Sequence, residues 1–276
     1  MLLISMDSIV KTALAEDLGR GDVTSSATIP PELTVEGYFI CKSPGVVAGL
    51  PYVQTAFRLI DPLVRLEVLL KEGAVVADGD VIAKVVGNAR SILASERVAL
   101  NFLQHLSGIA TTTAAAVEAA RPYHAVITDT RKTTPGLRMA EKYAVTVGGG
   151  KNHRLGLDDG ILIKDNHIKA AGGIKNAIDM ARRKAGHLLK IEIETETLAE
   201  VREAVECGAD VILLDNMSLD ELRASVKLVA GRALTEASGG ITPAMVADIA
   251  ATGVDIISLG WITHSALPLD ISLELS

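Results

Sequence analysis

The chain contains few aromatic residues, few cysteines and no long apolar run, and each shortage excludes a class of protein. Phe, Trp and Tyr make up only 3% of the 276 residues, too few for a stacking surface that binds single-stranded nucleic acid. No apolar run approaches the about 18 residues that a membrane-spanning helix needs. We therefore expect neither a nucleic-acid-binding protein nor a membrane protein.

The two cysteines, Cys41 and Cys207, stand far apart and form no CxxC pair. This spacing indicates neither a disulfide framework nor a zinc site. The N-terminus lacks the basic and apolar pattern of an export signal, and free thiols are typical of the cytosol. We therefore expect a cytoplasmic protein, and the 49% of apolar residues is ample for a large core.

The first part of the chain predicts a domain rich in strands. Residues 34–90 alternate polar and apolar side chains between glycine-containing turns. An amphipathic helix is predicted at 6–18, ending at Gly19, and a long helix at about 91–119, either continuous or broken at Gly108. Arg97 stands among apolar residues of the long helix, either directed to solvent or as a functional cation.

From Pro122 onward, short apolar runs alternate with helical segments. The candidate strands are residues 125–130, 160–166, 188–194, 210–216, 233–239 and 255–261, and from 188 their starts recur every 22 to 23 residues. Thr197, Ser218 and Thr242 are candidate helix N-caps. This period predicts parallel βαβ units. No GxGxxG motif follows any of the strands, which favours an open, incomplete TIM-like α/β barrel over a dinucleotide-binding sheet.

Each predicted strand ends in polar residues or glycine. The strand ends are Asp129-Thr130-Arg131, Lys164-Asp165-Asn166, Glu194, Asp215-Asn216, Ser238-Gly239-Gly240 and Gly260. Because the carboxyl ends of parallel strands open on one face of a barrel, these residues should meet at one mouth. Cations follow the early strands, carboxylates the middle ones, and Ser or Gly the last two. That order favours an active site, in which the glycine-rich turns would cradle a phosphate.

The segment 129–169 is rich in cations within an acidic chain. It carries eight Lys and Arg residues, although the formal net charge is −7, and this favours a small anionic ligand. Together with Glu194 and Asp215, the cations fit transfer of a phosphorylated sugar to an anionic acceptor. The two acids would stabilise an oxocarbenium ion or bind Mg²⁺. Lys164 also permits a Schiff-base aldolase, and His153 and His167 are either anion donors or structural loop residues.

Several blocks of the sequence resemble quinolinate phosphoribosyltransferase, the decarboxylating nicotinate-nucleotide pyrophosphorylase of NAD synthesis. They are EDLGRGDVT, SERVALNFLQHLSGIAT, DTRKTTPGLR, GGGKNHRLGLDDGILIKDNH, DVILLDN, EASGGI and SLGWITHSA. The resemblance implies an N-terminal α/β sandwich-like domain, residues 1–106 completed by 265–276, and an open α/β barrel, residues 107–264. It also implies a homodimer, or a higher assembly, whose active sites borrow residues from the neighbouring subunit.

The resemblance further implies a role for each residue of the barrel mouth. Quinolinate would contact Arg97 of the neighbouring subunit, Thr130, Arg131, Lys132, His153, Arg154 and Lys164. Lys164, Glu194 and Asp215 would be catalytic, the two acids facing the ribose and Mg²⁺ of phosphoribosyl pyrophosphate (PRPP). The phosphate would lie against Ser238, Gly239, Gly240, Gly260 and Trp261. Trp261 departs from the family pattern of a small residue, and it either narrows the phosphate end or packs against a helix.

Alternatives stay open at this point. A molybdenum-transport-associated relative of the family would diverge around the quinolinate cations, whereas the TRK, NHR and ILIKDNH blocks are intact here. A nicotinate phosphoribosyltransferase would need fewer cations, because its acceptor carries a single carboxylate. A Schiff-base aldolase using Lys164, or a non-catalytic anion-binding protein, would release no pyrophosphate.

Overall fold

A computed structural model gives the structure of the chain and describes residues 3–276, with side chains from residue 6 onward. Met1 and Leu2, which begin the N-terminal stretch that was compared with an export signal, lie outside this range. The chain packs as two compact units. The first holds the described residues up to Ala114 together with Thr133–Gly149 and Trp261–Ser276, and the second holds Ala115–Lys132 and Gly150–Gly260. Each unit is made of more than one segment of the chain, so the units do not divide the chain at one position. The domain boundary expected between residues 106 and 107 therefore stays a prediction.

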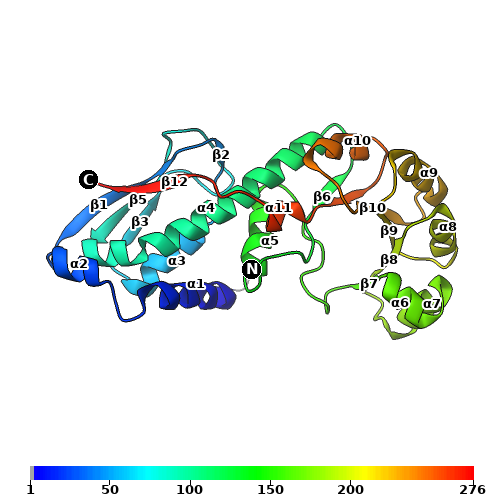
Figure 1. The fold of residues 1–276 in the computed structure, drawn as a ribbon, viewed down its shortest axis with the longest axis horizontal. Coiled ribbons are helices and arrows are strands. Elements are labelled where there is room, and N and C mark those ends of the chain that lie inside the picture. The colour runs from blue at the N-terminus through cyan, green and yellow to red at the C-terminus, as the bar shows by residue number, and fades with distance from the viewer. Residues whose placement is uncertain (1–2) are drawn as a thin grey trace. The chain divides into compact units, whose positions relative to one another are not determined.

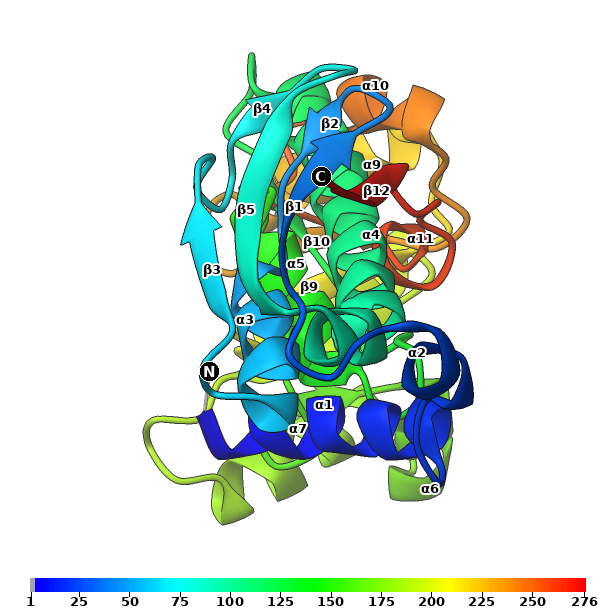
Figure 2. The same cartoon turned by 90° about the vertical axis from the view of Figure 1, so that its left-hand side faces the viewer.

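The first unit is built on a four-stranded antiparallel sheet with the order β12-β1-β5-β3 (Figures 1 and 2). The strands are β12 (Ile271–Leu275), β1 (Thr34–Cys41), β5 (Val81–Asn88) and β3 (Arg65–Val68). Toward its end β1 buries every second residue, as its period-two pattern predicts. Strand β12 pairs with β1 from Gly37 opposite Leu275 to Cys41 opposite Ile271, so the C-terminal end of the chain completes this sheet.

Helices and a small β-ribbon complete the first unit. They are α1 (Leu3–Leu18), α2 (Val23–Thr28), α3 (Leu50–Ile60), α5 (Arg138–Val147), α11 (Trp261–His264) and the pair β2 (Gly45–Val46) and β4 (Val75–Val76). The helix predicted at 6–18 is confirmed as α1, which crosses below the strands in Figure 2. The alternation over 34–90 did not predict α3. Its start is fixed by Glu72, whose Oε1 accepts the backbone N–H groups of Gly49 at 2.9 Å and Leu50 at 2.6 Å.

Helix α4 (Ala89–Ala120) is continuous, so of the two possibilities left open at Gly108 the unbroken helix is confirmed. Gly108 instead makes room for the C-terminal segment, because a Cβ atom there would lie 2.1 Å from the backbone oxygen of Leu267. Nearby, the backbone N–H of Leu269 donates to the carbonyl oxygen of Gln104 at 2.9 Å. The position therefore requires the absence of a side chain, not a break in the helix.

Gly108→Ala is expected to lower the free energy of unfolding by about 1–3 kcal/mol. The added methyl group would press on main-chain atoms of Leu267 that cannot rotate away, even though Ala is the better helix former. Gly186→Ala is the matched control, because no atom lies within 4 Å of a Cβ built there. Urea unfolding of both variants tests this, and a Gly108 variant as stable as the wild type would contradict the close approach.

The second unit holds a six-stranded parallel sheet with the order β6-β11-β10-β9-β8-β7. A strand lies at each of the six predicted runs: β6 (Val126–Thr128), β7 (Ile161–Ile163), β8 (Ile191–Thr195), β9 (Val211–Asp215), β10 (Leu234–Ser238) and β11 (Ile256–Ser258). Strands β6 and β7 are the two edges of this sheet (Figure 1). In the described part of the chain the α/β barrel is therefore open, as predicted.

Short helices follow the strands of the second unit. They are α6 (Asp165–Ala171), α7 (Ile174–Lys184), α8 (Leu198–Glu206), α9 (Leu219–Val229), the 3-10 helix η1 (Pro243–Met245) and α10 (Val246–Ala250). Thr197 and Ser218 are confirmed as N-caps, each in a capping box with a glutamate three residues on. Thr242 precedes η1 but forms no capping hydrogen bond through its side chain. Between residues 3 and 276, no helix has the length and apolarity that crossing a membrane requires.

Candidate functional site

A pocket of about 540 Å³ lies at the carboxyl ends of the parallel strands, within the second unit. Each strand ends where the chain turns into a loop or helix, so side chains at these ends face a common space. Most of the residues predicted from sequence line it: Thr130, Arg131, Lys132, His153, Arg154, Lys164, Glu194, Asp215, Ser238, Gly239 and Gly240. The structure therefore brings together cations, carboxylates and glycine turns that are far apart in the sequence.

The other predicted site residues lie elsewhere in the described chain. Arg97 is on α4 and Trp261 is the first residue of α11, and both belong to the first unit. Gly260 follows β11 in the second unit but is outside the pocket lining. The roles expected for Arg97, Gly260 and Trp261 stay predictions.

Two polar lining residues, Glu236 and Ser258, were not predicted, nor was Glu192, which is buried beside them. Each stands two residues before a predicted strand-end residue. Because side chains along a strand alternate between its faces, residues two apart point the same way. The signal that could have identified them is therefore a polar residue two positions before each strand end, within an otherwise apolar strand.

The cationic side of the pocket is held by the segment that follows Gly150. Its backbone runs beside β6 and forms a parallel bridge between Thr128 and Lys151. The backbone N–H of Lys151 donates to the carbonyl oxygen of Ile127 at 2.9 Å. The fully buried carboxylate of Asp129 accepts the backbone N–H of His153 at 2.9 Å. These bonds fix His153 and the residue after it at the edge of the sheet.

Arg154 is held among other polar groups. Its Nη1 donates to the carbonyl oxygen of Gly160 at 3.2 Å. Burial, and then the positive charge of Arg131, lower the pKa of the Arg154 guanidinium. Two partly buried guanidinium groups that repel each other would be stabilised by an anion between them. The arrangement therefore favours an anionic ligand at this end of the pocket.

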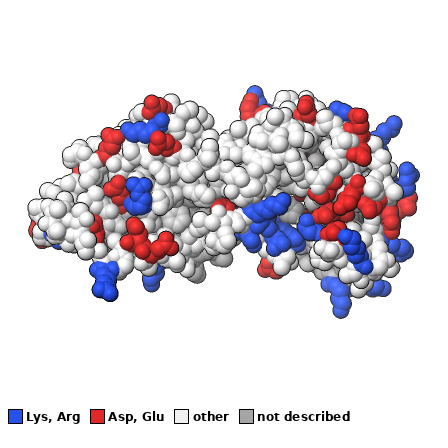
Figure 3. All heavy atoms as spheres, viewed as in Figure 1, with Lys and Arg blue, Asp and Glu red and all other residues white. Residues whose placement is uncertain are grey.

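The acidic side of the pocket is formed by Glu194 and Asp215, the predicted carboxylate pair. Nζ of Lys164 forms an ion pair with Oε2 of Glu194 at 2.7 Å. Burial, and then the charge of Glu194, raise the pKa of Asp215. Figure 3 shows Lys and Arg atoms adjoining Asp and Glu atoms on one face of the protein. Positive charge next to Glu194 and Asp215 would therefore be stabilised.

A tight turn of the backbone closes the remaining side of the pocket. Gly239 and Gly240 have φ angles of +90° and +58°, and Asn216 also has a positive φ of 55°. A Cβ atom on Gly239 would lie 2.5 Å from the side-chain carbon Cγ of Asn216. Side-chain Nδ2 of Asn216 donates to Oδ2 of Asp215 at 2.7 Å. Glycine is therefore required at position 239 by both conformation and space.

His167 has a structural role in the described chain. Its Nδ1 accepts the backbone N–H of Lys164 at 3.0 Å, which caps the start of α6. Of the two readings left open for His167, the hydrogen bond supports the loop residue. Glu194, Glu196 and Asp215 form a group whose carboxylate oxygens lie within 4.8 Å of one another and could hold a metal ion.

Two family models match the chain. One is described as the C-terminal domain of quinolinate phosphoribosyl transferase and matches residues 109–274. The other is described as the N-terminal domain of quinolinate phosphoribosyl transferase and matches residues 22–107. Together they cover all but the last residue of the sheet of the first unit and the whole parallel sheet of the second.

Curated proteins and solved structures are similar to the chain over nearly its full length. A probable nicotinate-nucleotide pyrophosphorylase (carboxylating) from Bacillus subtilis is 46% identical over 273 residues, which cover 99% of this chain and 94% of that protein. The chloroplastic nicotinate-nucleotide pyrophosphorylase (carboxylating) of Arabidopsis thaliana is 45% identical, covering 98% and 82%. The crystal structure of NadC from Streptococcus pyogenes matches with a TM-score of 0.97 at 43% identity, covering 100% and 98%.

Proposed function

Because the chain belongs to the quinolinate phosphoribosyltransferase family, we propose that it transfers the phosphoribosyl group of PRPP to quinolinate with loss of one carboxylate. The products are nicotinate mononucleotide, pyrophosphate and CO₂, and the reaction belongs to de novo NAD synthesis. The observation that carries the proposal is one pocket in which four cations (Arg131, Lys132, Arg154 and Lys164) adjoin two carboxylates and a glycine turn. That combination fits an anionic acceptor, a sugar cation and a phosphate.

Quinolinate carries two adjacent carboxylates on a pyridine ring, so its site needs several cations. Arg131, Lys132 and Arg154 supply them at one end of the pocket. A planar guanidinium suits a carboxylate, because it donates two parallel hydrogen bonds. Thr130 supports this end, since its hydroxyl oxygen accepts the backbone N–H of Lys132 at 3.0 Å. The mutual repulsion of Arg131 and Arg154 would be relieved when the dianion binds.

PRPP takes the other end of the pocket in this proposal. Lys164 lies between the two substrates, and its ion pair with Glu194 fixes the ammonium group. Glu194 and Asp215 face the ribose, where positive charge develops as pyrophosphate leaves C1′. The 5′-phosphate binds the turn at Ser238, Gly239 and Gly240, whose successive positive-φ glycines can present backbone N–H groups to an anion.

Mg²⁺ fits the same acidic end. The ion prefers oxygen ligands and keeps several waters, so it is bound by a few carboxylates together with substrate phosphates. Glu194 and Asp215 offer carboxylate oxygens close enough to share one ion. Bound there with PRPP, Mg²⁺ would supply positive charge to the pyrophosphate leaving group.

The chemical sequence follows from this arrangement. Pyrophosphate leaves C1′ of the ribose, and the pyridine nitrogen of quinolinate attacks the carbon. The ring nitrogen becomes positively charged, which withdraws electrons from the adjacent C2 and allows its carboxylate to depart as CO₂. The cations of Arg131 and Arg154 would hold the ring so that its nitrogen faces C1′.

The aldolase alternative is disfavoured by the contacts of Lys164. A Schiff base requires a neutral amine as nucleophile. Nζ of Lys164 instead lies 2.7 Å from Oε2 of Glu194, so the amine is engaged in an ion pair and is not free to act as the nucleophile. The molybdenum-transport-associated alternative is not favoured either, because the chain retains the cations of the acceptor site.

The proposal includes a homodimer. Arg97 lies on α4 of the first unit, and in the proposed assembly it would reach the quinolinate end of the neighbouring subunit's pocket. Gly260 and Trp261 would lie near the 5′-phosphate. Mixing a pocket variant with an Arg97 variant tests the assembly, because subunit exchange should restore one intact site in a dimer.

The test of the function is an assay with quinolinate, PRPP and Mg²⁺ in which pyrophosphate and CO₂ are measured together. Equal release of both is expected from phosphoribosyl transfer coupled to decarboxylation. Pyrophosphate without CO₂ would indicate another acceptor or hydrolysis of PRPP. Release of neither product would contradict the proposal.

Gly239→Ala is expected to raise the KM for PRPP about 10-fold or more, because the turn must move to relieve the contact with Asn216. Gly208→Ala is the matched control, since Gly208 has a φ of +74° but nothing within 4 Å of an added Cβ. The control has a similar backbone strain without the clash, so its KM for PRPP should stay at the wild-type value. Steady-state kinetics with varied PRPP compare the two, and equal KM values would contradict the phosphate cradle.

A further inference from the structure

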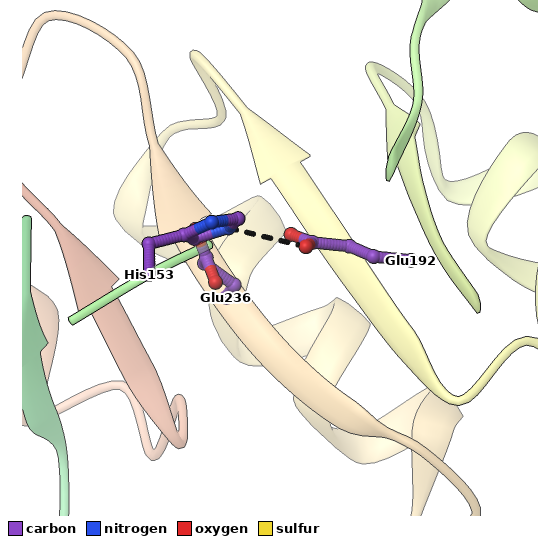
Figure 4. A group of neighbouring side chains, drawn as sticks. All are labelled: His153, Glu192 and Glu236. Carbon is purple, nitrogen blue, oxygen red and sulfur yellow. Dashed lines mark ion pairs between the residues drawn. The ribbon is translucent and has the colours of Figure 1, made fainter. Parts of the chain in front are cut away.

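Two buried carboxylates and a histidine meet in the wall of the pocket (Figure 4). Nε2 of His153 lies 3.1 Å from Oε2 of Glu192 and 3.6 Å from Oε1 of Glu236. Glu192 comes from β8 and Glu236 from β10, with exposed fractions of 8% and 2%. Two carboxylates buried together are costly unless charge is neutralised. The substrate contacts proposed above use neither of them.

The hydrogen bonds of His153 assign the proton on its ring. The backbone N–H of Arg154 donates to Nδ1 at 2.8 Å, so Nδ1 is an acceptor and carries no proton. The proton therefore lies on Nε2, which donates it to Glu192, and the ring is neutral. His153, Glu192 and Glu236 are close enough together to hold a metal ion, but a metal would need the lone pair of Nε2. Because Nε2 carries a proton in this tautomer, the three side chains are better suited to sharing a proton than to binding a metal ion.

The shared proton belongs on Glu236. Glu192 already accepts the N–H of His153, whereas Glu236 is the more deeply buried of the two. Burial, and then the charge of Glu192, raise the pKa of Glu236, while His153, a hydrogen bond with Ser258 and the charge of Lys164 act in the opposite direction. Each glutamate also has one buried oxygen, Oε1, without a hydrogen-bond partner among the described residues. If Glu236 is a neutral acid, the free-energy cost of burying two neighbouring charges falls, and so does the cost of the two oxygens without a partner.

Resting on the proposed function, we propose that Glu236 is the acid that protonates the ring carbon from which CO₂ departs. Glu236 lines the same pocket as the acceptor cations Arg131 and Arg154. The reaction replaces the carboxylate at C2 by hydrogen, so a proton must be delivered to that carbon. A neutral acid can deliver it, and before the reaction it does not repel the dianionic acceptor as a carboxylate would.

The step balances in atoms and electrons. The bond between C2 and its carboxylate carbon breaks, CO₂ departs, and the electron pair of that bond stays on C2 beside the positively charged ring nitrogen. The pair takes the proton of the Glu236 carboxyl group, a C2–H bond forms, and Glu236 is left as a carboxylate. Water returns a proton before the next turnover. Glu192 still accepts the N–H of His153, so the proton returns to Glu236.

Glu236→Gln tests the proposal, because the amide keeps the size of the side chain but is no longer an acid. CO₂ release is expected to fall by about 10² or more relative to pyrophosphate release, and the mononucleotide that retains both carboxylates should accumulate. Glu206→Gln is the matched control, since it removes one charge from an exposed residue of α8. If a folded Glu236→Gln protein released CO₂ and pyrophosphate in equal amounts, whether fast or slowly, the proposal would be overturned. If the wild type itself released neither product, the proposed function would fail instead.

Glu192→Gln gives a second, independent test that leaves the acid in place. Without the charge of Glu192, Glu236 should lose its proton at lower pH. CO₂ release depends on the protonated acid, so it declines as pH rises, and this decline should begin at lower pH in Glu192→Gln than in the wild type. A uniform loss of activity with an unchanged pH profile would mean that the pair is only structural, and would overturn the proposal even if Glu236→Gln failed to fold.

Discussion

Asp215→Asn is expected to lower kcat by about 10²–10³-fold while the protein stays folded. Asp215 ends β9, and burial together with the charge of Glu194 raises its pKa. Such a carboxylate is poorly stabilised until positive charge arrives, and that charge develops on the ribose only as pyrophosphate leaves. The amide keeps the size of the side chain and can still accept the hydrogen bond that Asn216 donates, so the variant removes charge with little change in packing.

The measurement is pyrophosphate release at saturating substrate concentrations, with circular dichroism and thermal unfolding as checks on the fold. Glu206→Gln provides the control for charge, because it removes one carboxylate from an exposed helix position. Its kcat should equal that of the wild type. A kcat of Asp215→Asn equal to that control would mean that the reaction does not use the charge of Asp215.

The parallel sheet could be predicted because its strands coincide with short, mostly apolar runs, and because the last four of these runs recur at a nearly constant spacing. The exceptions are local. The segment after Ile163 was expected to continue as strand, but α6 begins at Asp165, with His167 bonded to the N–H of Lys164. Such a bond depends on a side chain that folds back on its own helix. The pattern of apolar residues in the sequence does not indicate this hydrogen bond.

The continuity of α4 could not be predicted for a different reason. Glycine in a helix usually signals a break or an end, and the sequence around Gly108 does not show what lies against it. The reason is a chain segment about 160 residues later, since the backbone oxygen of Leu267 occupies the space of a side chain. Contacts between distant segments of this kind are outside the reach of a local pattern.

Within the site, the residues at the strand ends could be predicted from the sequence, whereas the buried residues one layer below them could not be predicted from the same pattern. Glu194 and Ser238 were identified because they end apolar runs. Glu192 and Glu236 stand two residues earlier, inside those runs, where a charged residue is costly. A buried charge that interrupts an apolar strand is therefore the feature to look for. In this chain it leads to the pair that His153 contacts.

The order of charges along the strands explains how one pocket can serve two anionic substrates. The carboxyl end of β6 and the loop beside it carry the cations, whereas β8 and β9 carry Glu194 and Asp215. Lys164 follows β7, the edge strand opposite β6, and forms an ion pair with Glu194 of the neighbouring strand β8. The acceptor and the sugar would therefore meet at the position where positive and negative side chains adjoin.

Arg131→Ala is expected to weaken quinolinate binding by about 10–100-fold, because a hydrogen-bonded charge pair contributes about 1.5–3 kcal/mol. Arg131 lies close enough to lower the pKa of Arg154 by its charge, so both guanidinium groups can engage one dianion. Arg131→Lys is the matched variant. It keeps the charge but lacks the planar fork, and its affinity should lie between those of the wild type and the alanine variant.

Isothermal titration with quinolinate, and separately with PRPP, measures the effect. The affinity for PRPP should be unchanged, because Arg131 belongs to the acceptor end of the pocket in the proposed arrangement. The loss should also be greater for quinolinate than for nicotinate, since only the dicarboxylate needs both Arg131 and Arg154. Wild-type affinity for quinolinate in Arg131→Ala would remove Arg131 from the acceptor site, whereas an equal loss for PRPP would reassign this cation to the pyrophosphate.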